Sequence, residues 1–151
     1  MPVKKYEKTI KGFRLVSEPT DIPVRKVDTS QLAADYARQF YLGDIDVYES
    51  FFIILLNRAN KTTSFAKISQ GGTVGTVVDI KIIAKYAVEG LANGVILVHN
   101  HPSGNINPSE ADKTITKKIK DALWLLDIAL YDHVIISNDK HYSFADDGNL
   151  Y

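Results

Sequence analysis

The stretch VILVHNHPSGNINPSEAD at residues 95–112 decides the fold, because it passes from a strand through a polar loop into a helix. Its first four residues, 95–98, have the length and composition of a strand that is covered on both faces. The loop turns at Gly104. Asn107 is the predicted N-cap of the helix and Pro108 its first residue.

Two histidines, His99 and His101, stand one residue apart where this strand ends. Alternate side chains of an extended backbone lie on the same face, so both imidazoles can converge on one point. Pro102 disfavours helical backbone at His101 and helps to keep that geometry. Asp112 falls just inside the following helix, whose positive N-terminal end favours an ionised carboxylate. Two neutral imidazoles and one carboxylate suit Zn²⁺, with water in the fourth tetrahedral position.

Glu49 and Ser109 are the candidate catalytic residues beside these three ligands. Zinc lowers the pKa of its water from ~15.7 to about 7, and a base must then take the proton. Glu49 directly precedes the apolar run 51–56, where its carboxylate could reach that water from a rigid position. Ser109 lies one helical turn before Asp112, so its hydroxyl could donate to the oxyanion of a tetrahedral intermediate.

Each part of this constellation also has a purely structural interpretation. A single His-x-His is more often a pair of loop histidines than a metal site. Ser109 and Asp112 could form a capping box in which Asp112 bonds back to the serine amide. Glu49 could be a solvated residue before a strand. The conjunction of two histidines at the end of a strand with Asp112 on the next helix favours the metal site.

The rest of the chain predicts helices and strands in irregular order. Helical spacing of apolar residues predicts helices that include 32–40, 80–91 and 115–126. Apolar runs bounded by turn residues predict strands at 51–56, 62–69, 95–98, 134–136 and 142–144. We therefore expect an α+β fold with a mixed sheet flanked by helices. A glycine-rich connection at 71–75 lacks the pattern of a phosphate-binding loop.

Composition narrows the classes of function. The chain has 151 residues, the length of one domain, and no cysteine, so disulfides and thiolate zinc ligands are excluded. Its 18 basic and 18 acidic residues cancel, so no net charge attracts nucleic acid. No apolar run reaches the ~20 residues of a membrane span, and no secretory signal is recognisable, so we expect a cytoplasmic protein. Residues 1–28 are predicted to form an N-terminal arm or strand and residues 29–151 one compact domain.

The order of these residues resembles a known motif. A distant upstream glutamate, His-x-His, seven residues, Ser, two residues and Asp is similar to the JAMM motif of the JAB1/MPN metalloprotease fold. The stretch 95–112, with LDI at 126–128 and DHVII at 132–136, resembles the bacterial RadC family more narrowly. The likeness covers about residues 28–146. It implies a cytidine-deaminase-like α/β/α sandwich, with the sheet between helices.

The resemblance also implies roles for single residues. By that likeness His99, His101 and Asp112 hold one Zn²⁺ per chain, Glu49 is the catalytic acid/base, and Ser109 belongs to the active site.

Three departures from the family pattern limit the comparison. Longer RadC proteins place a helix-hairpin-helix segment before this domain, and no space for it exists ahead of Thr29, so DNA binding by that segment is not expected. Asn100 stands between the histidines, where eukaryotic JAMM deubiquitinases usually have Ser or Thr, so deubiquitination is not expected. Many RadC relatives have a His-Pro pair at the middle helix, where this chain has Asp79-Ile80.

Two further polar residues lie near the last long strand. His133 follows Asp132 at its predicted start, and the pair could orient a metal ligand or the substrate. The alternative is a structural histidine whose hydrogen bonds are satisfied within the core.

Three functions follow from these observations. The first is a zinc-dependent hydrolase that cleaves a peptide or isopeptide amide bond in a peptide or protein substrate. The second is a nucleic-acid-processing or DNA-repair protein, as the family name suggests, although the neutral charge lowers this expectation. The third is a non-catalytic interaction module, which the complete set of metal ligands makes the weaker interpretation.

Overall fold

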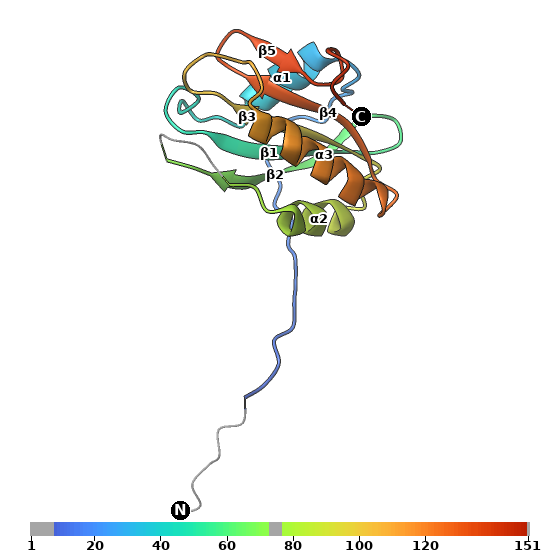
Figure 1. The fold of residues 1–151 in the computed structure, drawn as a ribbon. Coiled ribbons are helices and arrows are strands. Elements are labelled where there is room, and N and C mark those ends of the chain that lie inside the picture. Colours follow the sequence, from blue (N-terminus) through green and yellow to red (C-terminus); the bar gives the residue numbers. More distant parts are fainter. Residues whose placement is uncertain (1–7, 73–76, 151) are drawn as a thin grey trace, which may run out of the picture.

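A computed structural model describes residues 8–72 and 77–150 of the chain. Within these residues five strands form one sheet in the order β2-β1-β3-β4-β5, and three helices cover it (Figure 1). The strands are β1 (Ser50–Leu56), β2 (Thr62–Gln70), β3 (Gly94–Asn100), β4 (Ala129–Ile136) and β5 (His141–Ser143). The helices are α1 (Ser30–Arg38), α2 (Ile80–Glu89) and α3 (Glu110–Trp124). Every helix and strand that the sequence predicts is present.

The sheet is mixed, as predicted. β1 runs antiparallel to both β2 and β3, β3 and β4 run parallel, and β5 is antiparallel to β4. Parallel neighbours need a crossover connection, and α3 supplies it between β3 and β4. Because β1 and β3 are antiparallel, the start of β1 and the end of β3 meet at the same end of the sheet, with Phe51 opposite His99.

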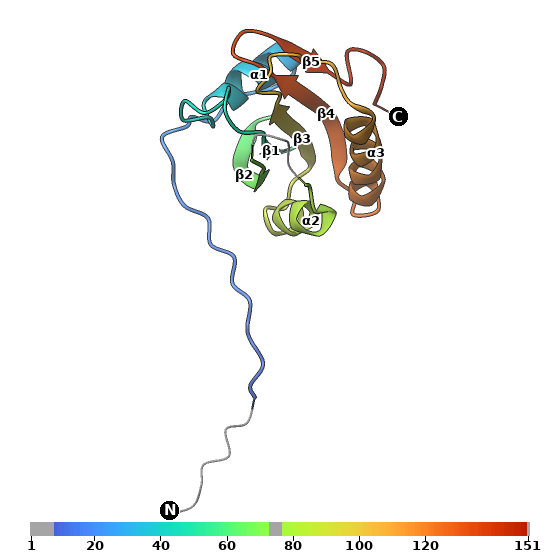
Figure 2. The same cartoon turned by 60° about the vertical axis from the view of Figure 1, so that its left-hand side comes forward.

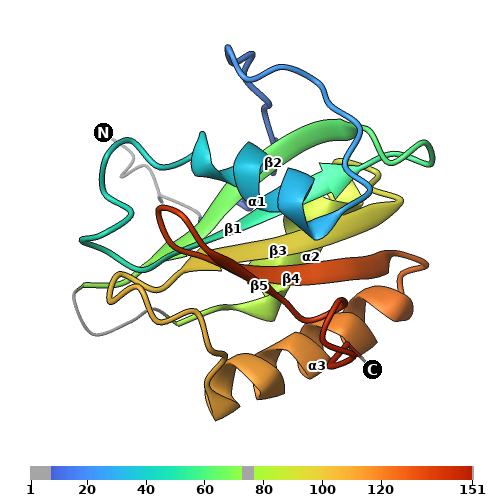
Figure 3. The same cartoon turned by 90° about the horizontal axis from the view of Figure 1, so that it is seen from above.

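The helices lie on both faces of this sheet. α1 packs on one face, where Ala37 joins the same core as Ile54. α2 and α3 pack on the other face, where Ile83 and Ile119 join the core of Ile53. Figures 2 and 3 show α1 on the side of the sheet opposite to α2 and α3. The prediction of an α+β fold with a sheet between helical layers is confirmed.

β4 begins earlier than the sequence predicts. Its parallel pairing with β3 starts at Ala129 opposite Gly94, well before the predicted start at residue 134. Asp132 and His133 are buried polar residues within this strand. They interrupt the apolar run from which strands are recognised, so the first half of β4 does not stand out in the sequence.

The predicted start of α3 is wrong. Ser109 is the N-cap and Glu110 the first helical residue, instead of Asn107 and Pro108. Ser109 Oγ accepts a hydrogen bond from the amide of Asp112 at 3.0 Å, and Asp112 Oδ2 accepts from the amide of Ser109 at 2.8 Å. This reciprocal capping box satisfies two amides at the helix start at once, which explains why the helix begins two residues later.

The chain before α1 has little regular structure. Residues 8–25 form neither helix nor strand, Lys26 pairs with Lys61 in an isolated bridge, and Val27 is buried against the α1 face of the sheet. Of the glycine-rich connection, residues 73–76 lie outside the described residues. In the described parts of the chain, none of the helices is both long and apolar enough to cross a membrane.

Candidate metal centre

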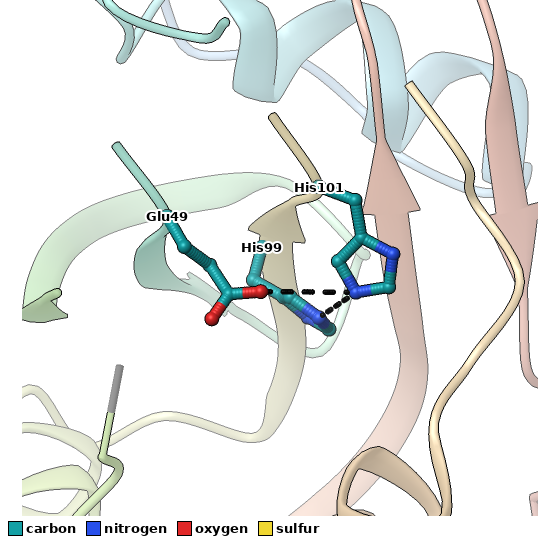
Figure 4. Close-up of side chains that lie close together, drawn as sticks. All are labelled: Glu49, His99 and His101. Carbon is teal, nitrogen blue, oxygen red and sulfur yellow. Dashed lines mark hydrogen bonds and ion pairs between the residues drawn. The ribbon is translucent and has the colours of Figure 1, made fainter. Parts of the chain in front are cut away.

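Four of the residues singled out in the sequence meet at one end of the sheet. Glu49 directly precedes β1, His99 lies in β3, and His101 follows it. Asp112 lies in the first turn of α3. The antiparallel pairing of β1 with β3 brings Glu49 beside the two histidines. Figure 4 shows the carboxylate of Glu49 and the two imidazole rings turned toward one another.

The ligand atoms of these residues lie close together. The Nε2 atoms of His99 and His101 are 3.0 Å apart. Asp112 contacts both rings, because its Oδ1 lies 3.3 Å from His99 Nε2 and its Oδ2 lies 3.4 Å from His101 Nε2. Glu49 Oε1 lies 3.8 Å from His101 Nε2. Ligand atoms of Glu49, His99 and His101 all lie within 4.8 Å of one another, so these residues form a group that can hold a metal ion.

The four side chains differ in exposure. The His99 side chain is 3% exposed, whereas those of His101, Asp112 and Glu49 are 15%, 17% and 20% exposed. One wall of the centre is therefore closed by the core, and the other side is open to solvent. A catalytic metal site needs such an opening, because the substrate must reach a free coordination position.

The electrostatics of the centre favour a cation. Burial raises the pKa of Asp112, but the neighbouring imidazoles of His101 and His99, together with the hydrogen bond from the Ser109 amide, outweigh burial and hold that pKa well below its usual range. Burial lowers the pKa of His101, but the hydrogen bond to Asp112 and the bond to the Asn105 carbonyl outweigh it, so the pKa of His101 is raised. An ionised carboxylate thus lies beside two imidazoles and stabilises a proton or a metal cation between them.

In both His99 and His101, the ring nitrogen that faces away from the centre, Nδ1, is hydrogen-bonded to another group of the protein. His101 Nδ1 lies 2.6 Å from the backbone oxygen of Asn105. A carbonyl only accepts, so Nδ1 carries the hydrogen and Nε2 of the neutral ring presents a lone pair to the centre. His99 Nδ1 lies 2.7 Å from Nε2 of His133. His133 is wholly buried, and this burial lowers its pKa well below the ordinary value, so the ring is neutral.

Asn100 has a positioning role that the sequence alone does not indicate. Its side-chain amide donates to the carbonyls of Ile45 and Tyr48, both at 2.7 Å, and its Oδ1 accepts from the amide of Ser50 at 2.8 Å. These bonds hold the chain on both sides of Glu49. The one signal in the sequence is alternation, because a strand that turns two histidines to one face turns the residue between them to the other.

The side chains of Ser109 and Asp132 both form hydrogen bonds that stabilise the fold. Ser109 Oγ accepts a hydrogen bond from the amide of Asp112, as a capping box requires, and this bond does not use the hydroxyl hydrogen.

Asp132 accepts hydrogen bonds from the hydroxyl of Ser143 at 2.6 Å and from the amides of His133 and Ala145 at 2.7 and 3.0 Å. Asp132 thereby ties β4 to β5 and to the segment that follows it. Burial raises the pKa of Asp132.

The mixed sheet, its helical layers and the histidine pair at the end of β3 define a domain of the JAB/MPN class. Residues 27–149 match the family described as RadC-like JAB domain, and the chain belongs to this family.

Relatives of known sequence support this assignment. A UPF0758 protein of Flavobacterium johnsoniae is 47% identical over 128 residues, which cover 85% of this chain and 56% of the relative. A UPF0758 protein of Porphyromonas gingivalis is 38% identical over 131 residues, which cover 86% of this chain and 57% of the relative. The UPF0758 protein YfjY of Escherichia coli is 41% identical over 102 residues, with 68% and 64% covered. The chain spans little more than half the length of the first two relatives.

Proposed function

We propose that this domain is a zinc-dependent hydrolase of the JAMM type, in which His99, His101 and Asp112 hold one Zn²⁺. The observation that carries the proposal is the spacing of their ligand atoms. Ligands about 2.1 Å from a tetrahedral zinc ion lie about 3.4 Å from one another. The two Nε2 atoms of His99 and His101 are 3.0 Å apart, and the carboxylate of Asp112 approaches each of them with a different oxygen, Oδ1 at 3.3 Å from His99 and Oδ2 at 3.4 Å from His101.

Glu49 fits the role of the proton acceptor better than that of a ligand. Its Oε1 is 3.8 Å from His101 Nε2, farther than the contacts that Asp112 makes to the two rings. When bound, zinc polarises the scissile carbonyl and makes a water molecule more acidic. Glu49 accepts the proton of the attacking water and returns it to the leaving amine. Asn100 supports this role, because its bonds to Tyr48 and Ser50 hold the backbone on both sides of Glu49.

The substrate that suits this arrangement is a peptide or isopeptide amide. Its hydrolysis needs a group that first takes a proton and later gives one to a poor leaving group, and a carboxylate such as Glu49 can do both. It also needs donors for the developing oxyanion. The hydroxyl of Ser109 can supply one, since its bond to the amide of Asp112 leaves the hydrogen available.

The first test is zinc content by elemental analysis after reconstitution and removal of excess metal. We expect about one zinc per chain in the parent and in Glu49→Gln. We expect loss of zinc in Asp112→Ala and in the His99→Ala, His101→Ala double variant. Asp121→Ala is the control, because it removes an exposed carboxylate from the same helix. A parent that binds no zinc, or a set of variants that all bind it alike, would refute the centre and favour the interaction module.

The second test is cleavage of peptide and isopeptide substrates by the zinc-loaded proteins. Glu49→Gln should retain zinc and lose about 10²–10⁴ of the rate, the usual contribution of a general base. An unchanged rate would remove Glu49 from the mechanism. Salt-sensitive DNA binding without amide cleavage would favour the nucleic-acid alternative instead.

A further inference from the structure

We infer that Thr116 and His133 form a hydrogen-bonded relay that sets the tautomer of His99 and joins this ring to the helical turn that carries Asp112. The inference deepens the proposed function and rests on it. In this relay His133 and Thr116 are positioning residues, because they act on the metal centre only through His99 and Asp112.

The direction of the relay follows from its last acceptor. Thr116 Oγ1 lies 2.6 Å from the backbone oxygen of Asp112. A carbonyl oxygen can only accept, so the threonine hydroxyl donates its single hydrogen there. Thr116 Oγ1 also lies 2.6 Å from His133 Nδ1. Because the hydroxyl hydrogen is already used, the oxygen accepts from the ring, and His133 carries its hydrogen on Nδ1.

The hydrogen on His133 Nδ1 also determines which nitrogen of His99 carries a hydrogen. A neutral imidazole has one N–H, so Nε2 of His133 is an acceptor. It lies 2.7 Å from His99 Nδ1, which therefore donates. His99 then has no hydrogen on Nε2 and turns a lone pair toward His101 and Asp112. This is the tautomer that a metal-ligating histidine needs, and a hydrogen bond to its outer nitrogen is the usual means of selecting it.

Burial makes the relay rigid. His99, Thr116 and His133 are all buried, so each of the three lies in the core. Phe144 stacks on the ring of His133 with centroids 4.8 Å apart, and Phe51 stacks on the ring of His99 at 5.6 Å. The stacked rings oppose rotation of the two imidazoles, which keeps their nitrogens in line.

The relay also links two ligands of the proposed centre. It starts at the ring of His99 in β3, passes through His133 in β4, and ends at the backbone oxygen of Asp112 in α3. Thr116 lies one helical turn after Asp112, and its side chain faces the sheet from there. Hydrogen bonds inside the core therefore fix the distance between His99 and the helical turn of Asp112 before any metal binds.

The relay makes a prediction about the metal-free protein. Long-range ¹H–¹⁵N NMR of the imidazole rings at mildly alkaline pH reports which nitrogen carries the hydrogen. We expect the Nδ1–H tautomer at both His99 and His133. In Thr116→Val, which removes the acceptor for His133 Nδ1, both rings should lose this preference. A parent in which His133 carries its hydrogen on Nε2 would overturn the relay, whatever the protein does with zinc.

Zinc affinity gives the second readout, measured by competition with a chromophoric chelator. Thr116→Val should weaken the affinity by about 10–100-fold, the usual effect of removing a group that orients a metal ligand. Thr116→Ser restores the hydroxyl and should recover the parent affinity. Thr114→Val makes the same replacement at an exposed position of α3 and should leave the affinity unchanged.

The two proposals can fail separately. Thr116→Val that binds zinc as tightly as the parent would overturn the relay and leave the metal centre standing. A parent that binds no zinc would refute the proposed function, and the NMR measurement would still decide whether the relay sets the tautomers. Melting temperatures of the three threonine variants show whether a lower affinity comes from a loss of folding, since Thr116→Ser shares the same site and keeps the hydroxyl.

Discussion

The two histidines of the centre are held by different parts of the molecule. His99 is bonded through His133 and Thr116, which lie in other elements of the core. His101 is bonded to the backbone oxygen of Asn105, within the loop that follows β3. We call the first region the buried wall, made of His99, Asn100, Thr116 and His133, and the second the front loop, made of residues 101–109.

The difference between these regions concerns how each is stabilised. The bond between His99 and His133 spans 34 residues of sequence, so it forms only when β3 and β4 have paired. The side-chain hydrogen bonds of the front loop span two to four residues, as between His101 and Asn105 or between Asn105 and Ser103. The loop is joined to β4 where it begins, because the amide of His101 donates to the carbonyl of Ile136 at 3.1 Å. Local bonds can break and reform without global unfolding. We therefore expect substitutions in the wall to lower the free energy of unfolding much more than substitutions in the loop.

The largest effect is expected at Asn100, the wall residue that holds the segment around Glu49. Asn100→Ala leaves the amide of Ser50 and two backbone carbonyls without their partner, and each such group costs about 1–3 kcal/mol. We expect a loss of about 3 kcal/mol or more in the free energy of unfolding, measured by urea denaturation. Asn105→Ala in the front loop removes one exposed bond and should cost less than about 1 kcal/mol. Equal losses of unfolding free energy in the two variants would contradict the difference in stability between the buried wall and the front loop.

The contrast also explains what the sequence could predict. β1 was recognised because its residues 51–56 are uniformly apolar, and β3 because four apolar residues precede His99. The metal ligands are predictable because two histidines at the end of a strand precede a carboxylate at the start of the next helix. Glu49 alone is interpreted equally well as a solvated residue before a strand, and its predicted role depends on the resemblance to the JAMM motif. Such patterns lie within short stretches, and short stretches are what sequence periodicity reports.

The relay and the Asn100 clamp were not predictable for the same reason. Thr116 is one of several polar residues in α3, and nothing in the helix marks it as the partner of His133. Asn100 is useful only because Ile45 and Tyr48 pass beside β3. Both roles depend on contacts between distant segments, which a single sequence does not show. The sequence offers two caps for α3, Asn107 and the capping box of Ser109 and Asp112. The structure has the second, because two reciprocal bonds outweigh the single cap offered by Asn107.

A second prediction concerns the backbone of the front loop. Gly104 has a φ of +84°, and a Cβ added there meets no atom within 4 Å, so Gly104→Ala should cost about 1–2 kcal/mol through backbone strain alone. Gly148→Ala is the matched control, with a φ of +70° and equally open surroundings. Both should lower the melting temperature. Only Gly104→Ala should weaken zinc binding, and a matching loss of affinity in Gly148→Ala would show that strain acts through global stability.

A third prediction separates two roles of Ser109, where the front loop meets α3. Ser109→Ala removes the N-cap and should lower the free energy of unfolding by about 1 kcal/mol. Thr29→Ala removes the N-cap of α1, whose Oγ1 accepts from the amide of Leu32 at 3.2 Å, and should cost about the same. If Ser109 also donates to the oxyanion, its variant alone should lose about 10²–10³ in the rate of amide cleavage. Equal rates would leave Ser109 with capping only.

The smallest effect is expected at Asp132 in β4, whose carboxylate accepts from the backbone amide of His133, from the amide of Ala145 and from the hydroxyl of Ser143. Burial raises its pKa in the folded state. Between the unfolded pKa, about 3.9, and this raised value, the folded protein binds more protons than the unfolded chain. The contribution of Asp132 to stability therefore decreases as the pH rises through that window, and it is most favourable below it.

Asp132→Asn tests this sign. The asparagine oxygen can still accept from the amides of His133 and Ala145, and its amide group can donate to Ser143, but it does not titrate. Urea denaturation of both proteins at a series of pH values should show the parent losing stability relative to the variant as the pH rises above about 4. A difference that does not change with pH would contradict the raised pKa. A shift of the His133 tautomer in the variant would show that the buried wall extends to Asp132, because the two residues then share one hydrogen-bonded unit.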